Sequence, residues 1–212
     1  MSPQNLNNFG FLLGDLLQKQ VNPIKEAVNK IQQNFSTSIP ANENLVGFIK
    51  HEYKIDELKD HVSSFIFDHV MVYERMYGYA NTISNQKTVG EHDLVLEELW
   101  VNFQKKGEYN PLHRHRGIYS FVIWLQVPYL IENEIKASPQ ISNINTNTAG
   151  CFQFVYINTL GHIHTNIIPV DKHYENKICF FPSELNHQVY PFYTSDDYRI
   201  SISGNIIQKI KE

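Results

Sequence analysis

The chain has 212 residues, a length that suits one domain with a full hydrophobic core. Hydrophobic residues make up 42% of it and charged residues 19%, which excludes a wholly disordered chain. The formal net charge is -4 and the basic residues are scattered, so we expect no nucleic-acid partner.

The sequence contains no apolar stretch of the roughly 18 residues that a membrane span needs, so we expect no membrane partner. The first residues lack a basic segment before their short apolar run, which argues against a signal peptide. The two cysteines, Cys151 and Cys179, lie in apolar, strand-like runs. This usage is typical of a reducing environment and predicts a cytoplasmic protein.

The first part of the chain has a helical period. Residues 22–35 carry apolar side chains every three or four positions, which predicts a helix with Asn22 as its cap and Pro23 as its first residue. A second apolar stripe predicts a helix over about 55–78. We therefore predict an N-terminal helical region over residues 1–95. It is expected to pack on the rest of the chain, to cover the mouth of a barrel there, or to form a homodimer.

Residues 96–212 form the second predicted unit, and their period is two. Short strands are expected over residues 99–104, 120–128, 151–157, 178–182, 187–192 and 198–206. A longer polar loop is expected between residues 129 and 149. Many short strands with closely spaced turns indicate a sandwich or a barrel. The predicted fold class is α+β, mainly β: a jelly roll whose two sheets enclose a cavity, with helices at its N-terminal side.

Two histidines separated by one residue open the strand region. His113 and His115 would leave the same face of a strand and could converge on one metal ion, while Arg114 faces away. His162 and His164 have the same spacing but lie in a polar, turn-like segment. The spacing alone is a weak signal, and surface histidines are the alternative interpretation of either pair.

An arginine begins the last predicted strand. Arg199 and Ser201 project to one face of this strand, and the isoleucines between and after them project to the other. An arginine that faces a cavity needs an anion, because an unpaired buried guanidinium is unfavourable. Its planar fork matches a carboxylate, and Ser201 can add a third hydrogen bond. The anion is either a ligand or a protein group such as Asp196 or Asp197.

Five short motifs follow one another in this half of the chain: WVN (100–102), NPLHRH (110–115), YSFVIWLQVP (119–128), FPSELNH (181–187) and RISIS (199–203). In this order they resemble the 2-oxoglutarate- and iron(II)-dependent dioxygenases, specifically a branch common in phages and marine bacteria. The resemblance covers roughly residues 96–206. It implies a double-stranded β-helix, a cupin-like jelly roll, and it extends the expected location to the cytoplasm of a phage-infected bacterium.

The resemblance also implies Fe(II) and, as a cosubstrate, 2-oxoglutarate. His113 and His187 would be iron ligands, and Arg199 with Ser201 would bind the distal carboxylate of 2-oxoglutarate. No catalytic residue is expected beyond the metal ligands. The implied reaction converts 2-oxoglutarate to succinate and carbon dioxide and hydroxylates a C–H bond of a peptide side chain or a small metabolite.

The chain departs from the usual pattern at one position. Two histidines and one carboxylate normally hold the iron, with the carboxylate two residues after the first histidine, where this chain has His115. Three-histidine iron sites occur in other cupin-type oxygenases, so we expect His115 to be the third ligand rather than a group beside the metal. Asn102 and Tyr119 are weaker candidates for contact with the cosubstrate.

Two other functions stay open. The first is a three-histidine, cupin-type iron oxygenase without 2-oxoglutarate, in which Arg199 would hold the substrate's own carboxylate. The second is a non-enzymatic jelly-roll module, with a binding or structural role and a decayed metal site. Oxygen consumption with and without 2-oxoglutarate tests the first, and metal content tests the second.

Overall fold

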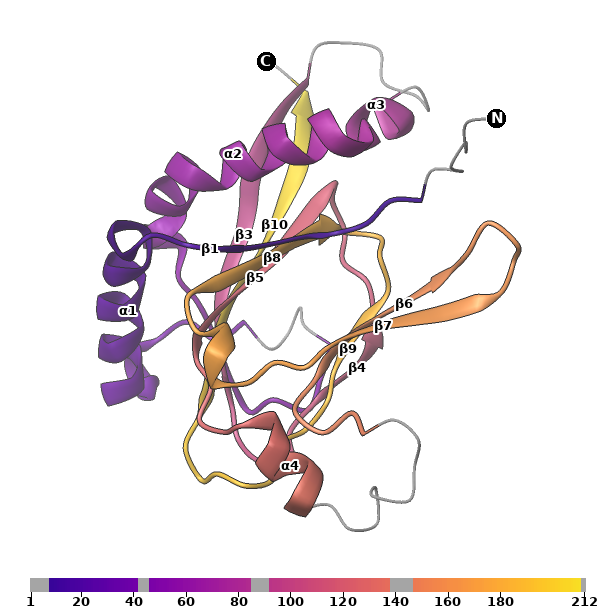
Figure 1. The fold of residues 1–212 in the computed structure, drawn as a ribbon. Helices are drawn as coiled ribbons and strands as arrows, with labels where there is room; N and C mark the ends of the chain where they lie inside the picture. The colour runs from indigo at the N-terminus through magenta and orange to yellow at the C-terminus, as the bar shows by residue number, and fades with distance from the viewer. Residues whose placement is uncertain (1–7, 42–45, 85–91, 138–146, 211–212) are drawn as a thin grey trace.

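A computed structural model describes residues 8–41, 46–84, 92–137 and 147–210 (Figure 1). The helices are α1 (Gln18–Gln33), α2 (Lys59–Tyr77), α3 (Tyr79–Ser84) and α4 (Ile131–Ala137). The strands are β1 (Leu12–Asp15), β2 (His51–Lys54), β3 (His92–Gln104), β4 (Asn110–His113), β5 (Tyr119–Gln126), β6 (Phe152–Ile157), β7 (Ile163–Ile168), β8 (Lys177–Pro182), β9 (His187–Val189) and β10 (Arg199–Ile210).

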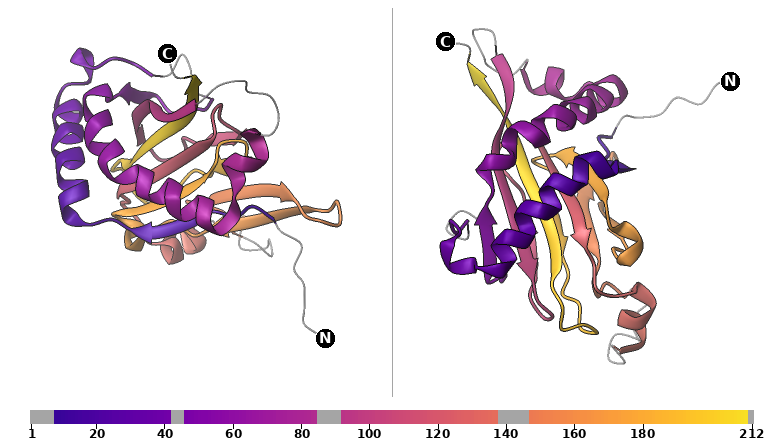
Figure 2. Two further views of the ribbon diagram at one scale, coloured as in Figure 1. Left: turned by 90° about the horizontal axis from the view of Figure 1, so that it is seen from above. Right: turned by 90° about the vertical axis from the view of Figure 1, so that its left-hand side faces the viewer.

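The strands form two antiparallel sheets. The larger sheet has the order β1-β8-β5-β10-β3-β2, and the smaller one has the order β4-β9-β6-β7. Both α1 and α2 lie over one face of the larger sheet (Figures 1 and 2). The molecule thus has a helical layer and two sheet layers, and the predicted mainly β jelly roll is confirmed.

Successive side chains of the larger sheet point to opposite faces, so the hydrophobic core has two clusters. Ile200 and Ile202 on β10 pack toward the helices, in a cluster that includes Val62 and Phe65 of α2. A second cluster lies between the sheets and includes Val122, Trp124, Phe152, Phe154 and Phe181. Because neighbouring residues of β10 face opposite layers, Arg199 and Ser201 face the space between the two sheets.

The N-terminal part contributes strands as well as helices. β1 pairs with β8, and β2 pairs with β3, so both outer strands of the larger sheet come from the first 95 residues. The division of the chain into residues 1–95 and 96–212 stays a prediction. None of the helices in the described ranges is long and apolar enough to cross a membrane.

The first helix begins earlier than predicted. α1 starts at Gln18, so the prediction of Asn22 as its cap and Pro23 as its first residue is wrong. The side-chain carbonyl of Gln20 accepts a hydrogen bond of 2.7 Å from the backbone N–H of Leu17, which satisfies a donor at the true helix start. α2 lies within the second predicted helix, about 55–78.

A predicted strand and a segment outside the predicted strand set form an exposed part of the smaller sheet. β6 and β7 make a hairpin that extends away from the rest of the molecule (Figure 1). Near its turn, Leu160 is 75% exposed and Ile163 is 76% exposed. β7 was expected to be a turn-like segment, and it is a strand because it pairs with β6 along its whole length.

Candidate metal and cosubstrate site

Three histidines come together between the sheets. His113 ends β4 and lies directly opposite His187, which begins β9, with ring centroids 4.3 Å apart. His115 follows two residues after β4, and its Nε2 atom lies 3.2 Å from Nε2 of His187. One ring nitrogen from each residue lies within 4.8 Å of the others, so the three imidazoles could share one ion.

Backbone carbonyls fix the orientation of two of these rings. Nδ1 of His113 lies 2.7 Å from the carbonyl oxygen of Pro111, and Nδ1 of His187 lies 2.8 Å from that of Leu185. A carbonyl can only accept, so Nδ1 carries the proton in both rings and Nε2 keeps its lone pair. Nitrogen lone pairs held in this way suit a divalent transition metal such as iron, and the donor set therefore fits a bound metal.

Burial keeps the three rings neutral. It lowers the pKa of His115 to about 3, with a further contribution from His113, and it lowers the pKa of His113 as well. The pKa of His187 is well below its usual value, mainly because of burial and also because of the two neighbouring histidines. Neutral imidazoles are the form that binds metal ions.

The loop that carries His115 is anchored by a chain of polar groups. The N–H of His115 donates to the carbonyl of Ser183 over 2.9 Å. The Ser183 hydroxyl lies 2.8 Å from that of Ser120, which donates to Oδ1 of Asn205 over 2.7 Å. Asn205 donates to the carboxylate of Glu98 over 2.6 Å. Each hydroxyl has one proton, so Ser183 must donate to Ser120, and the chain runs in one direction toward the anion.

A glycine lets this loop approach the larger sheet. Gly117 has φ of 116°, a conformation that side chains disfavour. A Cβ atom at this position would lie 2.7 Å from the carbonyl oxygen of Ile206 on β10. The HRHRG segment therefore needs its glycine to hold His115 near the other two histidines.

The same cavity contains most of the other predicted site residues. Its wall includes the three histidines together with Asn102, Arg199 and Ser201. Asn102 donates to Ser201 over 3.4 Å and accepts from the indole N–H of Trp100 over 3.1 Å. The Trp100 ring lies 5.7 Å from that of His115, centroid to centroid. Asn102 thus links the strand that holds Arg199 to the surroundings of the histidines.

Tyr119 lies on the other face of the larger sheet. Its ring packs against Tyr73 of α2 and Phe180 of β8, and its hydroxyl donates to Glu74 of α2. Tyr119 is not part of the cavity wall. Side chains on β5 point alternately to the two faces of the sheet, and the Tyr119 side chain points to the helices. The structure therefore does not bring Tyr119 to the cosubstrate position that the sequence suggested.

Arg199 is buried, with 4% of its surface exposed, among neutral acceptors. Nε and Nη2 donate to Oε1 of Gln104 over 3.0 and 2.5 Å. Nη1 donates to the hydroxyl of Tyr129 and to the carbonyl of Gly150, each over 2.8 Å. Within the described residues, no carboxylate forms an ion pair with this guanidinium. Its charge is thus uncompensated in the cavity, and an anion is expected there.

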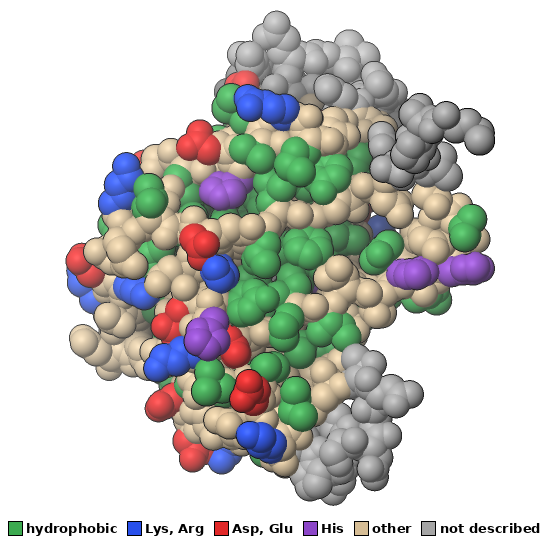
Figure 3. Space-filling view, viewed as in Figure 1, with side chains coloured by type: hydrophobic (Ala, Val, Ile, Leu, Met, Phe, Trp, Pro, Cys, Tyr) green, Lys and Arg blue, Asp and Glu red, His purple; other side chains and the backbone are tan. Residues whose placement is uncertain are grey.

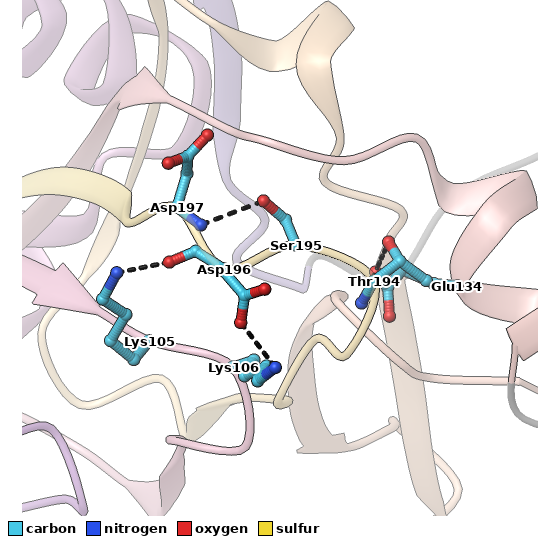
Figure 4. Close-up of polar contacts among 7 residues, drawn as sticks. All are labelled: Lys105, Lys106, Glu134, Thr194, Ser195, Asp196 and Asp197. Carbon is cyan, nitrogen blue, oxygen red and sulfur yellow. Dashed lines mark hydrogen bonds and ion pairs between the residues drawn. The ribbon is translucent and has the colours of Figure 1, made fainter.

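The two aspartates that precede Arg199 make other contacts (Figure 4). Asp196 forms an ion pair of 2.5 Å with Lys106, and its carbonyl accepts from Lys105. Asp197 donates its N–H to the Ser195 hydroxyl over 3.1 Å. Neither aspartate forms an ion pair with Arg199. The anion that Arg199 needs can therefore be a ligand.

The same loop is held from the other side by a buried carboxylate. Glu134 of α4 accepts from the N–H groups of Tyr193 and Thr194 over 2.7 and 2.9 Å, and from the Thr194 hydroxyl (Figure 4). These contacts fix the segment that leads into β10 and so position Arg199.

Gln104, Tyr129 and Glu52 also belong to this region, and the sequence did not single them out. Gln104 lies two residues after Asn102 on β3, so the two side chains share a face, and this alternation is the signal that points to Gln104. Tyr129 lies just beyond β5, and Glu52 lies on β2, a short strand that carried no spacing signal.

The comparisons with known proteins agree with this geometry. The family model described as "Putative 2OG-Fe(II) oxygenase" matches residues 98–205, about half of the chain. The chain therefore belongs to this family of 2-oxoglutarate- and iron(II)-dependent oxygenases, and it is an oxidoreductase. The family assignment made from the five motifs is confirmed, and its phage and marine branch stays a prediction.

Solved structures support the fold. A prolyl-4-hydroxylase from Pseudomonas putida aligns over 95% of this chain and 94% of its own, with 14% identity and a TM-score of 0.54. An oxidoreductase of the 2OG-Fe(II) oxygenase family from Burkholderia pseudomallei aligns over 57% of this chain and 47% of its own, with 14% identity and a TM-score of 0.36. At such identity the first likeness shows the fold alone, and the second carries no conclusion. Curated proteins gave no match.

Proposed function

We propose that the protein binds Fe(II) through His113, His115 and His187 and binds 2-oxoglutarate through Arg199. In this proposal it hydroxylates a C–H bond of a peptide side chain or a small molecule. The observation that carries it is the meeting, in one cavity, of three neutral imidazoles and a buried guanidinium without an anionic partner among the described residues.

Each side chain has a definite task in this mechanism. His113 and His187 present Nε2 because their Nδ1 protons are held by backbone carbonyls. His115 completes the set from a loop that Ser183 anchors. When bound, iron and 2-oxoglutarate together supply the oxidising chemistry, which consumes the oxo acid and dioxygen and adds one oxygen atom to the substrate.

Arg199 selects the cosubstrate by its charge and its fixed position. Gln104, Tyr129 and Gly150 occupy four of its hydrogen-bonding directions and hold the guanidinium rigid. Five N–H groups are available to an arginine, so a donor remains for a carboxylate. Ser201 lines the same cavity and supplies a hydroxyl beside it. Apolar rings close to His187, from Phe152 and Phe181, limit the access of water.

The test measures the binding of metal and cosubstrate separately, by calorimetry without oxygen. We expect Mn(II), as an inert substitute for Fe(II), to bind the wild-type protein, and 2-oxoglutarate to bind the metal-loaded form. Arg199→Ala should keep the metal and weaken 2-oxoglutarate binding by about a hundredfold, since charge-assisted hydrogen bonds are lost. Arg114→Ala is the matched control, because Arg114 is exposed, and it should bind both normally. Absence of 2-oxoglutarate binding to the metal-loaded protein would contradict the proposal.

The three-histidine oxygenase without 2-oxoglutarate is favoured by one observation: the histidine group includes no carboxylate from the part of the chain that the structure describes. Oxygen consumption decides between the two functions. Uptake that depends on 2-oxoglutarate supports the proposal, and uptake without it supports the alternative.

We also propose that the protein works in the cytoplasm of a phage-infected bacterium. Both cysteines, Cys151 and Cys179, are buried and unpaired, which suits a reducing compartment. The phage host rests on the motif resemblance alone. The homodimer stays a prediction, and analytical ultracentrifugation tests it.

A further inference from the structure

Four further residues line the cavity beside those assigned to iron and 2-oxoglutarate. Val46 and Ile49 precede β2, Glu52 lies on β2, and Asn110 begins β4, and all four line the cavity. Glu52 pairs in register with Asn102, which pairs in register with Ser201. The carboxyl group is therefore in the same row of the larger sheet as the serine that neighbours Arg199.

Glu52 is the one acidic residue in the described wall of this cavity, and it is 3% exposed. It does not belong to the histidine group, whose ligand atoms lie within 4.8 Å of one another. It forms no ion pair with Arg199 within 4.0 Å. Burial, with a smaller contribution from Glu108, raises the pKa of Glu52 to about 7. Such a carboxyl group ionises readily once a cation lies beside it.

Asn110, which lines the same cavity, supplies an independent observation. Its side-chain oxygen is buried and has no hydrogen-bond donor among the described residues. A Cβ atom on Gly47 would lie 1.9 Å from this oxygen, so the absence of a side chain at Gly47 makes room for it. A buried acceptor without a donor is unfavourable, and a ligand with N–H groups would satisfy it.

We propose that Glu52 and Asn110 bind a cationic nitrogen group of the substrate, an ammonium or a guanidinium. This inference rests on the proposed function, in which Arg199 already holds the anion of the cosubstrate. A cation with several N–H groups can donate to the unpartnered oxygen of Asn110 and also to the Glu52 carboxylate, whereas an alcohol has a single proton to donate. Val46 and Ile49 give apolar surface for the methylene groups that carry such a cation. The substrate class is then a compound with a basic side chain, similar to lysine or arginine.

The experiment compares two probes of equal size, butylammonium chloride and n-butanol, at constant ionic strength. Calorimetry measures their binding to protein loaded with Mn(II) and with N-oxalylglycine, an inert analogue of 2-oxoglutarate. We expect the wild-type protein to bind butylammonium at least about tenfold more tightly than butanol, because the hydrogen bonds to the cation are charge-assisted.

Two variants locate the preference. Glu52→Gln keeps the size and the neutral state of the side chain, and it should bring the affinity for butylammonium down to that for butanol. Glu132→Gln is the matched control, since Glu132 is exposed on α4, and it should keep the preference. Asn110→Ala should weaken butylammonium binding severalfold by removing one acceptor.

Equal binding of the two probes by the wild-type protein, or no measurable binding of butylammonium, would overturn the inference. So would a preference that survives Glu52→Gln. Separate titrations of Mn(II) and of 2-oxoglutarate distinguish a failure of this inference from a failure of the proposed function. If both bind and the cation preference is missing, only the substrate inference fails. If 2-oxoglutarate does not bind, the proposed function fails, and the two probes are compared on the protein without N-oxalylglycine: a preference for butylammonium there supports the cation site, and equal binding overturns it.

Discussion

His113 and His115 are separated by one residue, and so are His162 and His164, yet the two pairs lie in different surroundings. The first pair lies between the sheets, where His187 completes a group of three. The second pair is exposed on the β6–β7 hairpin, and Figure 3 shows histidine side chains standing at that edge of the molecule. Identical spacing therefore does not make a metal site.

The difference comes from what faces each pair. β4 has β9 beside it and lies against the larger sheet, so a third histidine and a buried cavity are supplied from elsewhere in the chain. β7 is the outermost strand of the smaller sheet, and most of its residues are exposed. The predictions that follow test this contrast between a buried group and an exposed pair.

The largest effect is expected from loss of a ligand in the buried group. His187→Ala should weaken Mn(II) binding by at least about a hundredfold, because one of three nitrogen ligands is removed. His164→Ala should leave binding unchanged, since its side chain is exposed on the hairpin. Calorimetry without oxygen measures both. Equal losses in the two variants would refute the assignment of the metal site.

Acid should destabilise the metal-free protein through the buried histidines. Burial lowers the pKa of His115 from 6.5 to about 3, so between these values the unfolded chain binds the proton and the native protein does not. Stability is therefore fully present above pH 6.5 and falls as the pH decreases, by up to about 3 kcal/mol at pH 4. Urea denaturation at pH 7 and pH 4 measures it, and His115→Gln should reduce the difference. An unchanged difference in that variant would show that other groups cause it.

The polar chain behind His115 should have a moderate effect. Ser120→Ala leaves the buried oxygen of Asn205 without its donor and should reduce the free energy of unfolding by about 1–3 kcal/mol. Metal affinity should fall less than tenfold, because His115 keeps its bond to Ser183. Ser64→Ala, at an exposed serine of α2, is the control and should change the stability little. Denaturation measures the stability and calorimetry the metal affinity. A loss of stability equal to that of the control would show that this chain of hydrogen bonds does not stabilise the protein.

The smallest effect is expected on the hairpin. Replacing both His162 and His164 by serine should change the free energy of unfolding by less than about 0.5 kcal/mol, because exposed side chains contribute little. Metal binding should also be unchanged. A loss of metal binding in this double variant would move the candidate site to the hairpin.

Much of the fold could be predicted from periodicity. α2 and β10 have periodic apolar patterns, and each is buried on the face that the pattern indicated, whereas β5 and β8 are unbroken apolar runs that are buried on both faces. Alternation also placed Arg199 and Ser201 on the inner face of β10. In α2 and β10 the buried face follows from the local sequence, because one face of each is covered along its length.

Other features depend on distant partners and gave no local signal. β2 has the sequence HEYK, and its charged residues do not indicate a strand. The strand forms because it pairs with β3. β7 is exposed on both faces, so its residues do not alternate. The sequence does not show which face Tyr119 takes, because the phase of a fully buried strand, such as β5, cannot be read from an unbroken apolar run. Glu52 lines the cavity because β2 pairs with β3, which puts Glu52 beside Asn102.

The pairing of β1 with β8 has a consequence for folding during synthesis. Leu12 pairs with Phe180, so the first strand is made long before its partner leaves the ribosome. At typical rates of translation the delay is on the order of ten to thirty seconds. Throughout that interval β1 has no neighbour in the sheet, and its backbone is open to association with other nascent chains. Closure of the larger sheet is thus among the last events of synthesis, and a chaperone that shields the emerging N-terminus should raise the yield of native protein.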